Sequence, residues 1–325
     1  MSDSAAIVTR NLTKAFGNHV AVNNLSLEVA KGELFGLVGP DGAGKTTIMR
    51  LLTGIMHPTS GEAWIEGHSI IGESEYIKER IGYMPQRFGL YEDLTVIENI
   101  HFYADLYGVP KRERPERIER FLSFSNLTPF VGRLAGNLSG GMKQKLGLAC
   151  ALIHTPEVLF LDEPTCGVDP VSRRDFWRIL YDLLKEKITI FVSTAYLDEA
   201  ERCTRIALIN RGGILTIDEP ARVKDSLVVP MIEIATPVPR RAREIIKGVK
   251  GVIAVSMYGD RLHVGMVGGE VKADVLNALG GAGTVIQGVR HIAPSLEDVF
   301  IARLEEEEEK REFRAKEDGG QGAPV

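Results

Sequence analysis

The sequence has 325 residues, enough for about two domains, because most domains contain roughly 100–200 residues. Its 44% hydrophobic and 26% charged residues are typical of a globular protein. A formal net charge of −5 argues against a protein dedicated to nucleic-acid binding, which usually has a basic excess. No apolar run reaches the ~18 residues of a membrane-spanning helix, so we expect any membrane role to depend on partners.

The three cysteines and the first residues indicate a reducing compartment. Cys150, Cys166 and Cys203 lack the paired spacing of a disulfide framework or a zinc site. The N-terminal residues lack the apolar core of a signal peptide. We therefore expect the chain to work in the cytosol.

Residues 1–220 predict an α/β domain in which short strands alternate with longer helices. The predicted strands are 33–38, 158–161 and 189–193, with a hairpin at 205–218. The run 158–161 is apolar throughout, which is typical of a strand buried on both faces of a parallel sheet.

A helical insert is expected within this domain, over about residues 91–140. Residues 94–107 and 113–124 have helical patterns, and Gly108-Val109-Pro110 separates them. The insert should therefore form a helical subdomain.

A second, smaller module is expected over residues 221–304, after a boundary near 220–230. Its pattern predicts a βαββαβ succession, with elements at 231–235, 239–248, 252–257, 262–267, 271–279 and 284–289. This succession is typical of a ferredoxin-like α+β fold. The charged residues 305–325 are expected to extend a helix that begins near Ser295 and then to become disordered.

A phosphate-binding motif follows the first predicted strand. Gly39-Pro40-Asp41-Gly42-Ala43-Gly44-Lys45-Thr46 matches G-x-x-x-x-G-K-[ST] and precedes a predicted helix over 46–52. Such a turn presents backbone N–H groups and the positive end of the helix dipole to phosphate. We expect Lys45 to reach the terminal phosphates of ATP and Thr46 to ligate Mg²⁺, with Thr47 beside them in the nucleotide site.

Two adjacent carboxylates complete this predicted site. Asp162 ends the apolar strand 158–161, where it can approach Mg²⁺ directly or through water, and Glu163 follows it. One carboxylate can serve the metal while its neighbour polarises the attacking water. We assign Asp162 to the metal and Glu163 to catalysis.

A second glycine-rich turn, Ser139-Gly140-Gly141, also opens a predicted helix and forms another anion-binding nest. One triphosphate does not need two such nests in one chain. The pairing resembles the ABC ATPase family, in which the second nest faces the γ-phosphate bound by a partner subunit. The resemblance implies that ATP is held between two cassettes.

Other residues follow the family's order over about residues 7–220. Phe16 resembles the aromatic residue that stacks on adenine. Gln86 resembles the glutamine that senses metal and water and borders the contact with the membrane domain. Asp169 resembles the aspartate that signals across the dimer. The resemblance thus implies a P-loop NTPase fold of the ABC type.

The ending of the second module narrows the resemblance. Residues 293–300, APSLEDVF, resemble the terminus of ATPase subunits of bacterial ABC-2-type exporters, including the daunorubicin-resistance type. The resemblance implies an ATPase at the inner face of the cell membrane, with a membrane-spanning permease subunit and a second ABC ATPase chain or domain as partners. It favours export over import and leaves the cargo open.

One position departs from the family pattern. After the strand 189–193 the family has a histidine that contacts the γ-phosphate, and this chain has Ala195. Loss of one donor to developing charge typically costs ~10²–10³ in rate. We therefore expect ATP to bind and to be hydrolysed slowly.

Three explanations of Ala195 stay open: a competent partner chain, a slow or differently organised homodimer, or an engineered substitution. Two alternative functions also stay open. The chain could be a non-catalytic or regulatory subunit of a heteromeric transporter. It could also be a soluble ABC ATPase outside transport, although its sequence contains neither a second ABC unit nor a long coiled-coil insert.

Overall fold

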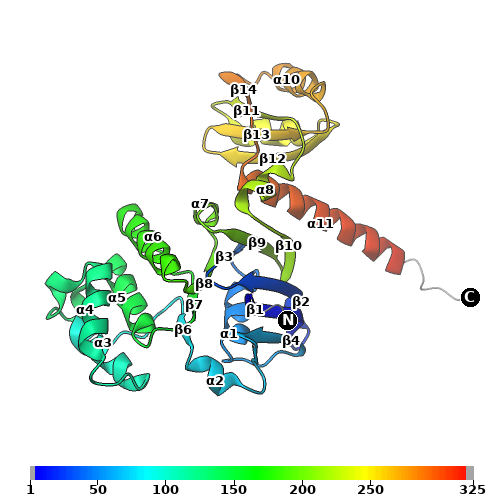
Figure 1. Cartoon of the computed structure of the whole chain (residues 1–325). Coiled ribbons are helices and arrows are strands. Elements are labelled where there is room, and N and C mark those ends of the chain that lie inside the picture. The colour runs from blue at the N-terminus through cyan, green and yellow to red at the C-terminus, as the bar shows by residue number, and fades with distance from the viewer. Residues whose placement is uncertain (1–3, 320–325) are drawn as a thin grey trace, which may run out of the picture. The chain divides into compact units, whose positions relative to one another are not determined.

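The computed structural model describes residues 4–319, and the chain divides into two compact units, Met1–Ile214 and Leu215–Val325 (Figure 1). The division falls within strand β10, six residues before the end of the predicted first domain. None of the helices in the described part of the chain combines the length and apolarity needed to cross a bilayer.

A six-stranded sheet forms the centre of the first unit, in the order β10-β9-β3-β8-β7-β6. The strands are β3 (Leu34–Val38), β6 (Ile81–Met84), β7 (Val158–Asp162), β8 (Thr189–Thr194), β9 (Arg205–Asn210) and β10 (Gly213–Asp218). The neighbours from β9 to β6 pair in parallel, and β3, β7 and β8 are buried along their whole length. The predicted α/β architecture is confirmed.

A second, antiparallel sheet was not predicted from the sequence. It has the order β2-β1-β4-β5 and consists of β1 (Ala5–Phe16), β2 (His19–Ala30), β4 (Ser60–Ile65) and β5 (His68–Ser69). Helix α1 (Lys45–Leu52) packs against strands of both sheets. A further short helix, α2 (Ser74–Lys78), packs against β5 and β6.

The helical part of the first unit gathers α3, α4 and α5 away from the antiparallel sheet (Figure 1). Its helices are α3 (Val96–Leu106), α4 (Arg114–Ser125) and α5 (Gly140–Leu152), with 3₁₀ turns at Thr128–Phe130 and Ala135–Asn137. Thr95 and Glu98 form a capping box that fixes the start of α3. Two more helices, α6 (Pro170–Lys185) and α7 (Leu197–Ala200), follow β7 and β8.

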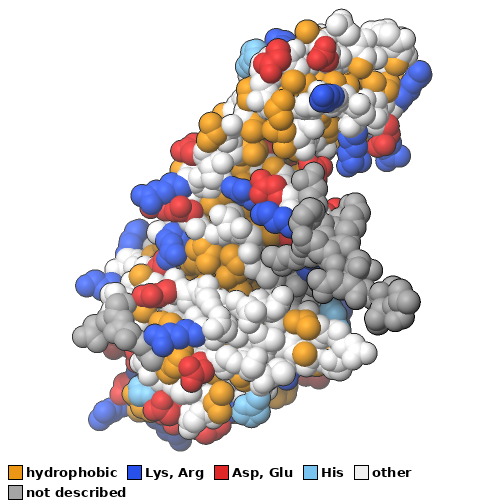
Figure 2. Space-filling view, turned by 90° about the vertical axis from the view of Figure 1, so that its right-hand side faces the viewer, with side chains coloured by type: hydrophobic (Ala, Val, Ile, Leu, Met, Phe, Trp, Pro, Cys, Tyr) orange, Lys and Arg blue, Asp and Glu red, His pale blue; other side chains and the backbone are white. Residues whose placement is uncertain are grey.

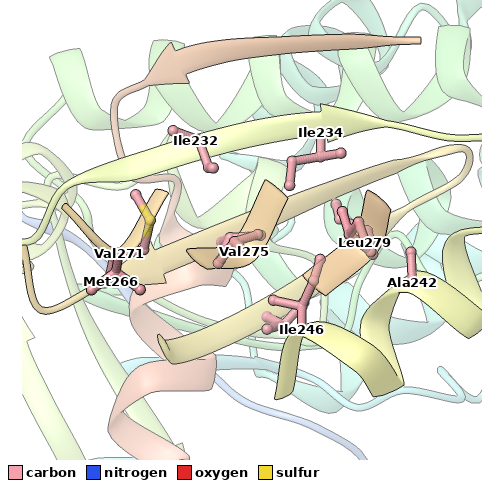
Figure 3. Packing of buried hydrophobic residues seen from close by; sticks show 11 residues of the cluster. Ile232, Ile234, Ala242, Ile246, Met266, Val271, Val275 and Leu279 are labelled. Atoms are coloured by element: carbon pink, nitrogen blue, oxygen red, sulfur yellow. The ribbon is translucent and has the colours of Figure 1, made fainter. Parts of the chain in front are cut away.

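The second unit contains an antiparallel sheet with the order β12-β13-β11-β14. Its elements are α8 (Pro220–Asp225), β11 (Met231–Ala235), α9 (Pro239–Lys247), β12 (Val252–Tyr258), β13 (Arg261–Met266), α10 (Val271–Gly281), β14 (Gly288–Ile292) and α11 (Leu296–Gly319). One core lies between the sheet and the helices α9 and α10: Ile232 and Ile234 face Ile246, Val275 and Leu279 (Figure 3).

One expectation for this unit needs correction. The last strand begins at Gly288 and not at 284, because β11 sets its register by pairing Ala235 with Gly288. Helix α11 extends from Leu296 to Gly319, in line with the expected extension of the helix into the charged residues after 305. Glutamate, lysine and arginine favour helix, and pairs such as Arg303–Glu306 at 2.9 Å support it. The expected disorder of residues 320–325 lies outside the described residues.

Acidic and basic side chains are interspersed over the face of the molecule shown in Figure 2. Exposed hydrophobic side chains lie among them. Such mixing of charge is typical of a solvated protein surface.

A partly buried histidine connects the helical part to the central sheet. His154 Nε2 lies 3.0 Å from the Ile81 carbonyl on β6, which accepts the hydrogen bond, and the imidazole stacks on Tyr107 at 4.0 Å between ring centroids. Nδ1 is buried and has no hydrogen-bond partner among the described residues. Burial lowers the pKa of His154, so the folded protein favours the neutral ring.

The stability of the first unit should therefore fall on acidification from about pH 6.5, the ordinary histidine pKa. Below that pH the unfolded chain binds a proton at residue 154 that the folded chain resists. We expect the melting temperature to drop more between pH 7.5 and 5.5 in the native protein than in His154→Gln. Calorimetry at both pH values measures this difference, and equal drops would contradict the assignment.

Candidate nucleotide-binding site

The four loops of the candidate site follow four neighbouring parallel strands. The loops that begin after Val38, Met84, Asp162 and Thr194 all leave the sheet at the carboxyl ends of β3, β6, β7 and β8. Parallel pairing places these ends at one edge, which is where open α/β sheets bind ligands.

Lys45 is the first residue of α1, and its side chain turns back over the phosphate-binding loop. Its ammonium lies 2.7 Å from the Gly39 carbonyl and 3.0 Å from the Pro40 carbonyl. It also forms an ion pair with Glu163 Oε1 at 3.0 Å. Only 4% of the Lys45 side chain is exposed, so the lysine is already desolvated and preorganised beside the loop.

Glycines let the loop approach its neighbours closely. A Cβ at Gly39 would lie 2.4 Å from the Ile209 carbonyl oxygen. Gly44 has a φ of 103°, and a Cβ there would lie 2.4 Å from the Ala21 carbonyl oxygen. These contacts explain why a side chain at either position would displace the loop.

Asp162 is buried at the end of β7, and one of its oxygens has a partner. Ser193 on β8 donates a hydrogen bond from Oγ to Asp162 Oδ1 at 2.6 Å. Asp162 Oδ2 is buried and has no hydrogen-bond partner among the described residues. A buried carboxylate oxygen without a donor fits a site that a cation completes. Burial, and then the nearby Asp162 charge, raise the pKa of Tyr83 to about 12, so this phenol stays protonated.

Glu163 occupies a strained backbone conformation and a central position. Its φ is 49°, in the left-handed region that non-glycine residues rarely adopt. Ser193 holds this backbone, because its Oγ and its carbonyl oxygen accept from Glu163 N at 3.0 and 3.2 Å. The Glu163 carboxylate contacts Lys45 through Oε1 and accepts from Gln86 Nε2 at 3.1 Å through Oε2.

These groups surround a pocket of about 690 Å³. The predicted residues that line it are Phe16, Asp41, Gly42, Gly44, Lys45, Thr46, Thr47, Gln86 and Glu163. Gly39 and Pro40 contribute carbonyl groups to Lys45, while Ala43 is buried and accepts from Gly212 N at 2.9 Å. The sequence reasoning thus selected residues from loops that are far apart in the chain.

The comparisons with known proteins agree with this geometry. A family model described as ABC transporter matches residues 22–166. The Nod factor export ATP-binding protein I of Cupriavidus metallidurans is 34% identical over 313 residues, which cover 92% of this chain and 97% of that protein. The chain belongs to the ATP-binding proteins of ABC transporters.

Another relative is similar over a shorter part of its length. The probable multidrug ABC transporter ATP-binding protein YbhF of Escherichia coli K12 is 49% identical over 227 residues, which cover 69% of this chain. The match covers only 39% of YbhF. Among solved structures, this chain is similar to the ATP-binding cassette MJ0796 in its dimeric form bound to ADP and Pi, with a TM-score of 0.60 and 26% sequence identity. The match covers 66% of this chain and 98% of the MJ0796 chain.

Asp162 does not line the pocket, and neither do Gly39, Pro40 and Ala43. Four further predicted residues of this ABC protein also lie outside the pocket lining of their own chain. Ser139 and Gly140 are exposed at the start of α5, where Ser139 Oγ accepts from Met142 N at 3.3 Å. Gly141 packs so closely that a Cβ would lie 2.5 Å from Ser172. Asp169 caps α6, and the hydrogen bonds from Ser172 and the Val171 backbone hold the pKa of its carboxyl below the usual range.

The pocket also contains residues that the sequence reasoning missed. His19, Ala21, Cys166 and Tyr196 line it together with Ala195. Ser193 supports both carboxylates from behind. Ser193 could have been identified, because it lies near the end of a predicted buried strand that neighbours 158–161. The sequence around His19, Ala21, Cys166 and Tyr196 shows no pattern that would have marked them.

The two loop glycines provide a matched test of the close approach. Gly39→Ala should weaken ATP binding at least tenfold, because the new methyl group meets backbone. Gly42→Ala should have a smaller effect, since open space surrounds Gly42 and only its φ of 79° opposes a side chain. Titration of each variant with a fluorescent ATP analogue gives both dissociation constants, and equal losses would contradict the steric explanation.

Proposed function

We propose that this chain hydrolyses ATP to power export through a separate membrane subunit. The observation that carries this proposal is the position of Glu163, held between Lys45 and Gln86 at the edge of the pocket. The names of the relatives, multidrug transport and Nod factor export, support export as the direction.

The ion pair between Lys45 and Glu163 couples ATP binding to activation of the catalytic base. A bound triphosphate offers Lys45 stronger anionic partners than one carboxylate and two carbonyl groups. When the ammonium moves to the phosphates, Glu163 loses its cation and becomes free to accept a proton from the attacking water. ATP binding would thereby prepare the catalytic base.

The residues fit a magnesium ion. Asp162 Oδ2 is the buried oxygen without a donor, and Thr46 and Gln86 line the pocket. These three residues would hold Mg²⁺, which neutralises the charge of the phosphates when it is bound. Asp162 Oδ1 stays bound to Ser193 and so keeps the carboxylate aimed in one direction.

A second cassette is needed to close the site. Ser139 and Gly140 are exposed and lie outside the pocket of their own chain, although a serine at a helix N-terminus next to glycine binds anions well. We infer that this turn binds the γ-phosphate held by a partner cassette. Asp169, which caps α6 next to the exposed Val171, would then lie near the same interface.

The contact with the permease is assigned to the segment 86–98. Gln86 begins this segment at the site, and the buried Asn99 fixes its later part: Asn99 Nδ2 donates to the carbonyl groups of Tyr91, Leu94 and Thr95. Tyr91 is 48% exposed on this surface. Through such a permease the chain would work at the inner face of the cell membrane.

Ala195 makes hydrolysis at this site slow. Its methyl group lines the pocket, where it offers no hydrogen bond to the γ-phosphate or the attacking water. A regulatory subunit of a heteromeric transporter is therefore the second candidate function. Turnover separates the two candidate functions.

Turnover of the purified chain should respond to two substitutions in opposite directions. Ala195→His should raise kcat by ~10²-fold, because it restores a preorganised donor. Glu163→Gln should lower kcat by ~10²-fold or more, because it removes the base, while nucleotide binding persists. Steady-state phosphate release measures both variants beside the native chain.

A native chain with ordinary turnover would contradict the slow-site hypothesis. If Glu163→Gln alone abolishes that turnover, the chain is a homodimeric motor that orients its water without a histidine. If neither the native chain nor Ala195→His hydrolyses ATP, the regulatory function replaces the catalytic one.

Dimerisation should depend on the turn at Ser139. In the Glu163→Gln background, ATP should convert monomers into dimers, because bound ATP is trapped between two cassettes. Ser139→Arg should abolish this conversion, since a long side chain fills the nest. Light scattering with and without ATP measures the mass, and Lys111→Ala, a charge change away from the nest, is the control. An ATP-dependent dimer of Ser139→Arg would contradict the assignment.

A further inference from the structure

A buried carboxylate behind the nucleotide pocket contacts three of the segments that shape it. Glu199 lies on α7, its side chain is 0% exposed, and it does not line the pocket. None of the catalytic roles proposed above uses this residue.

Glu199 is held by two hydroxyl groups and one guanidinium. Thr165 Oγ1 donates a hydrogen bond to Glu199 Oε1. Thr194 Oγ1 donates to Glu199 Oε2 at 2.7 Å. Arg173 Nε forms an ion pair with Oε1 at 3.4 Å, although this nitrogen makes no hydrogen bond among the described residues. A carboxylate removed from water needs such partners, so the three groups and Glu199 order one another.

Each partner belongs to a different segment of the site. Thr165 lies two residues after Glu163, and its neighbour Cys166 lines the pocket. Thr194 precedes Ala195 and accepts a hydrogen bond from Tyr196 N at 3.0 Å.

Arg173 lies in the first turn of α6, the helix that Asp169 caps. Its guanidinium covers the Tyr196 ring at 4.5 Å. One carboxylate therefore ties the loop after β7, the loop after β8 and the start of α6 together.

This arrangement matters more in a site that has Ala195 in place of the family's histidine. A histidine could anchor the loop after β8 by contacting the γ-phosphate, whereas the Ala195 methyl group makes no polar contact. Contacts within the protein then fix the position of Ala195 and Tyr196: Thr194 is held by Glu199, and Arg173 covers the Tyr196 ring.

We propose that Glu199 is a positioning residue, which holds the Glu163 loop and the loop 194–196 in one arrangement against the nucleotide pocket. Its effect on hydrolysis rests on the function proposed above. Its effect on the order of the two loops does not depend on that function.

Amide hydrogen exchange of the full-length chain, followed by mass spectrometry, measures loop order without activity. Glu199→Gln keeps the size of the side chain and removes its charge. We expect exchange in 163–168 and 194–197 to accelerate by about tenfold while β3 is unchanged, as for a local opening. Asp198→Asn is the matched control, because Asp198 contacts the same Arg173 at 3.5 Å and its side chain is 65% exposed. It should leave exchange within about twofold of the native rate.

A second pair of variants tests the same network from Thr165. Thr165→Val preserves the shape and removes the hydroxyl group, so it should accelerate exchange in the same segments. Thr165→Ser retains the hydroxyl group and should preserve the native rate. Two results would overturn the proposal. One is unchanged exchange in the two loops of both Glu199→Gln and Thr165→Val. The other is exchange of β3 that accelerates in both variants as much as exchange of the loops.

ATP turnover separates positioning for catalysis from mere stabilisation. In the native and the Ala195→His backgrounds, Glu199→Gln should lower kcat by about tenfold and change KM by less than twofold, whereas Asp198→Asn should change neither. Full turnover of Glu199→Gln despite faster exchange would overturn the catalytic part. If no background hydrolyses ATP, the function proposed above fails, and exchange alone decides the role of Glu199.

Discussion

Parallel pairing of β7 with β8 is the constraint on which the site depends. It places Asp162 opposite Ser193, and the same sheet places Val38 opposite Thr194. A slip of one residue would turn these side chains to the other face of the sheet. Ser193 could then no longer bind Asp162 and the Glu163 backbone, and both carboxylates would lose their positions. The burial of β3, β7 and β8 therefore specifies the chemistry as well as the fold.

Charge pairing inside the pocket follows from this register. Lys45 and Glu163 are largely buried, with 4% and 14% of their side chains exposed, and each would be costly to bury alone. Together they satisfy each other at 3.0 Å, and Gln86 occupies the second oxygen of Glu163. On the function proposed above, a triphosphate would compete with Glu163 for Lys45. The same interaction that allows burial would then make the site responsive to phosphate.

Local sequence was enough to predict the phosphate-binding loop, the buried strand before Asp162 and the α/β class, because each depends on neighbouring residues. It missed the antiparallel sheet and began the last strand four residues early, because both depend on pairing between distant segments. Glu199 was equally out of reach. Thr165 lies 34 residues before it, and only the fold brings the two together. Residues that act through contacts between segments this far apart in the sequence are not marked by any local sequence pattern.

If hydrolysis at this site is slow, as proposed above, Ala195 separates ATP binding from hydrolysis, and the rest of the site explains how. The methyl group removes one donor, worth roughly 3–4 kcal/mol to a transition state, but it leaves the phosphate-binding loop and both carboxylates in place. The strained backbone of Glu163, with φ at 49°, is still held by Ser193, and the loop that carries Ala195 is still held by Glu199 through Thr194. A site that lacks one hydrogen-bond donor but keeps its loops and carboxylates in place can still bind ATP. It would keep two cassettes together for longer than a site that hydrolyses ATP rapidly. Slow hydrolysis would then lengthen the closed state of the transporter and leave the closing step intact.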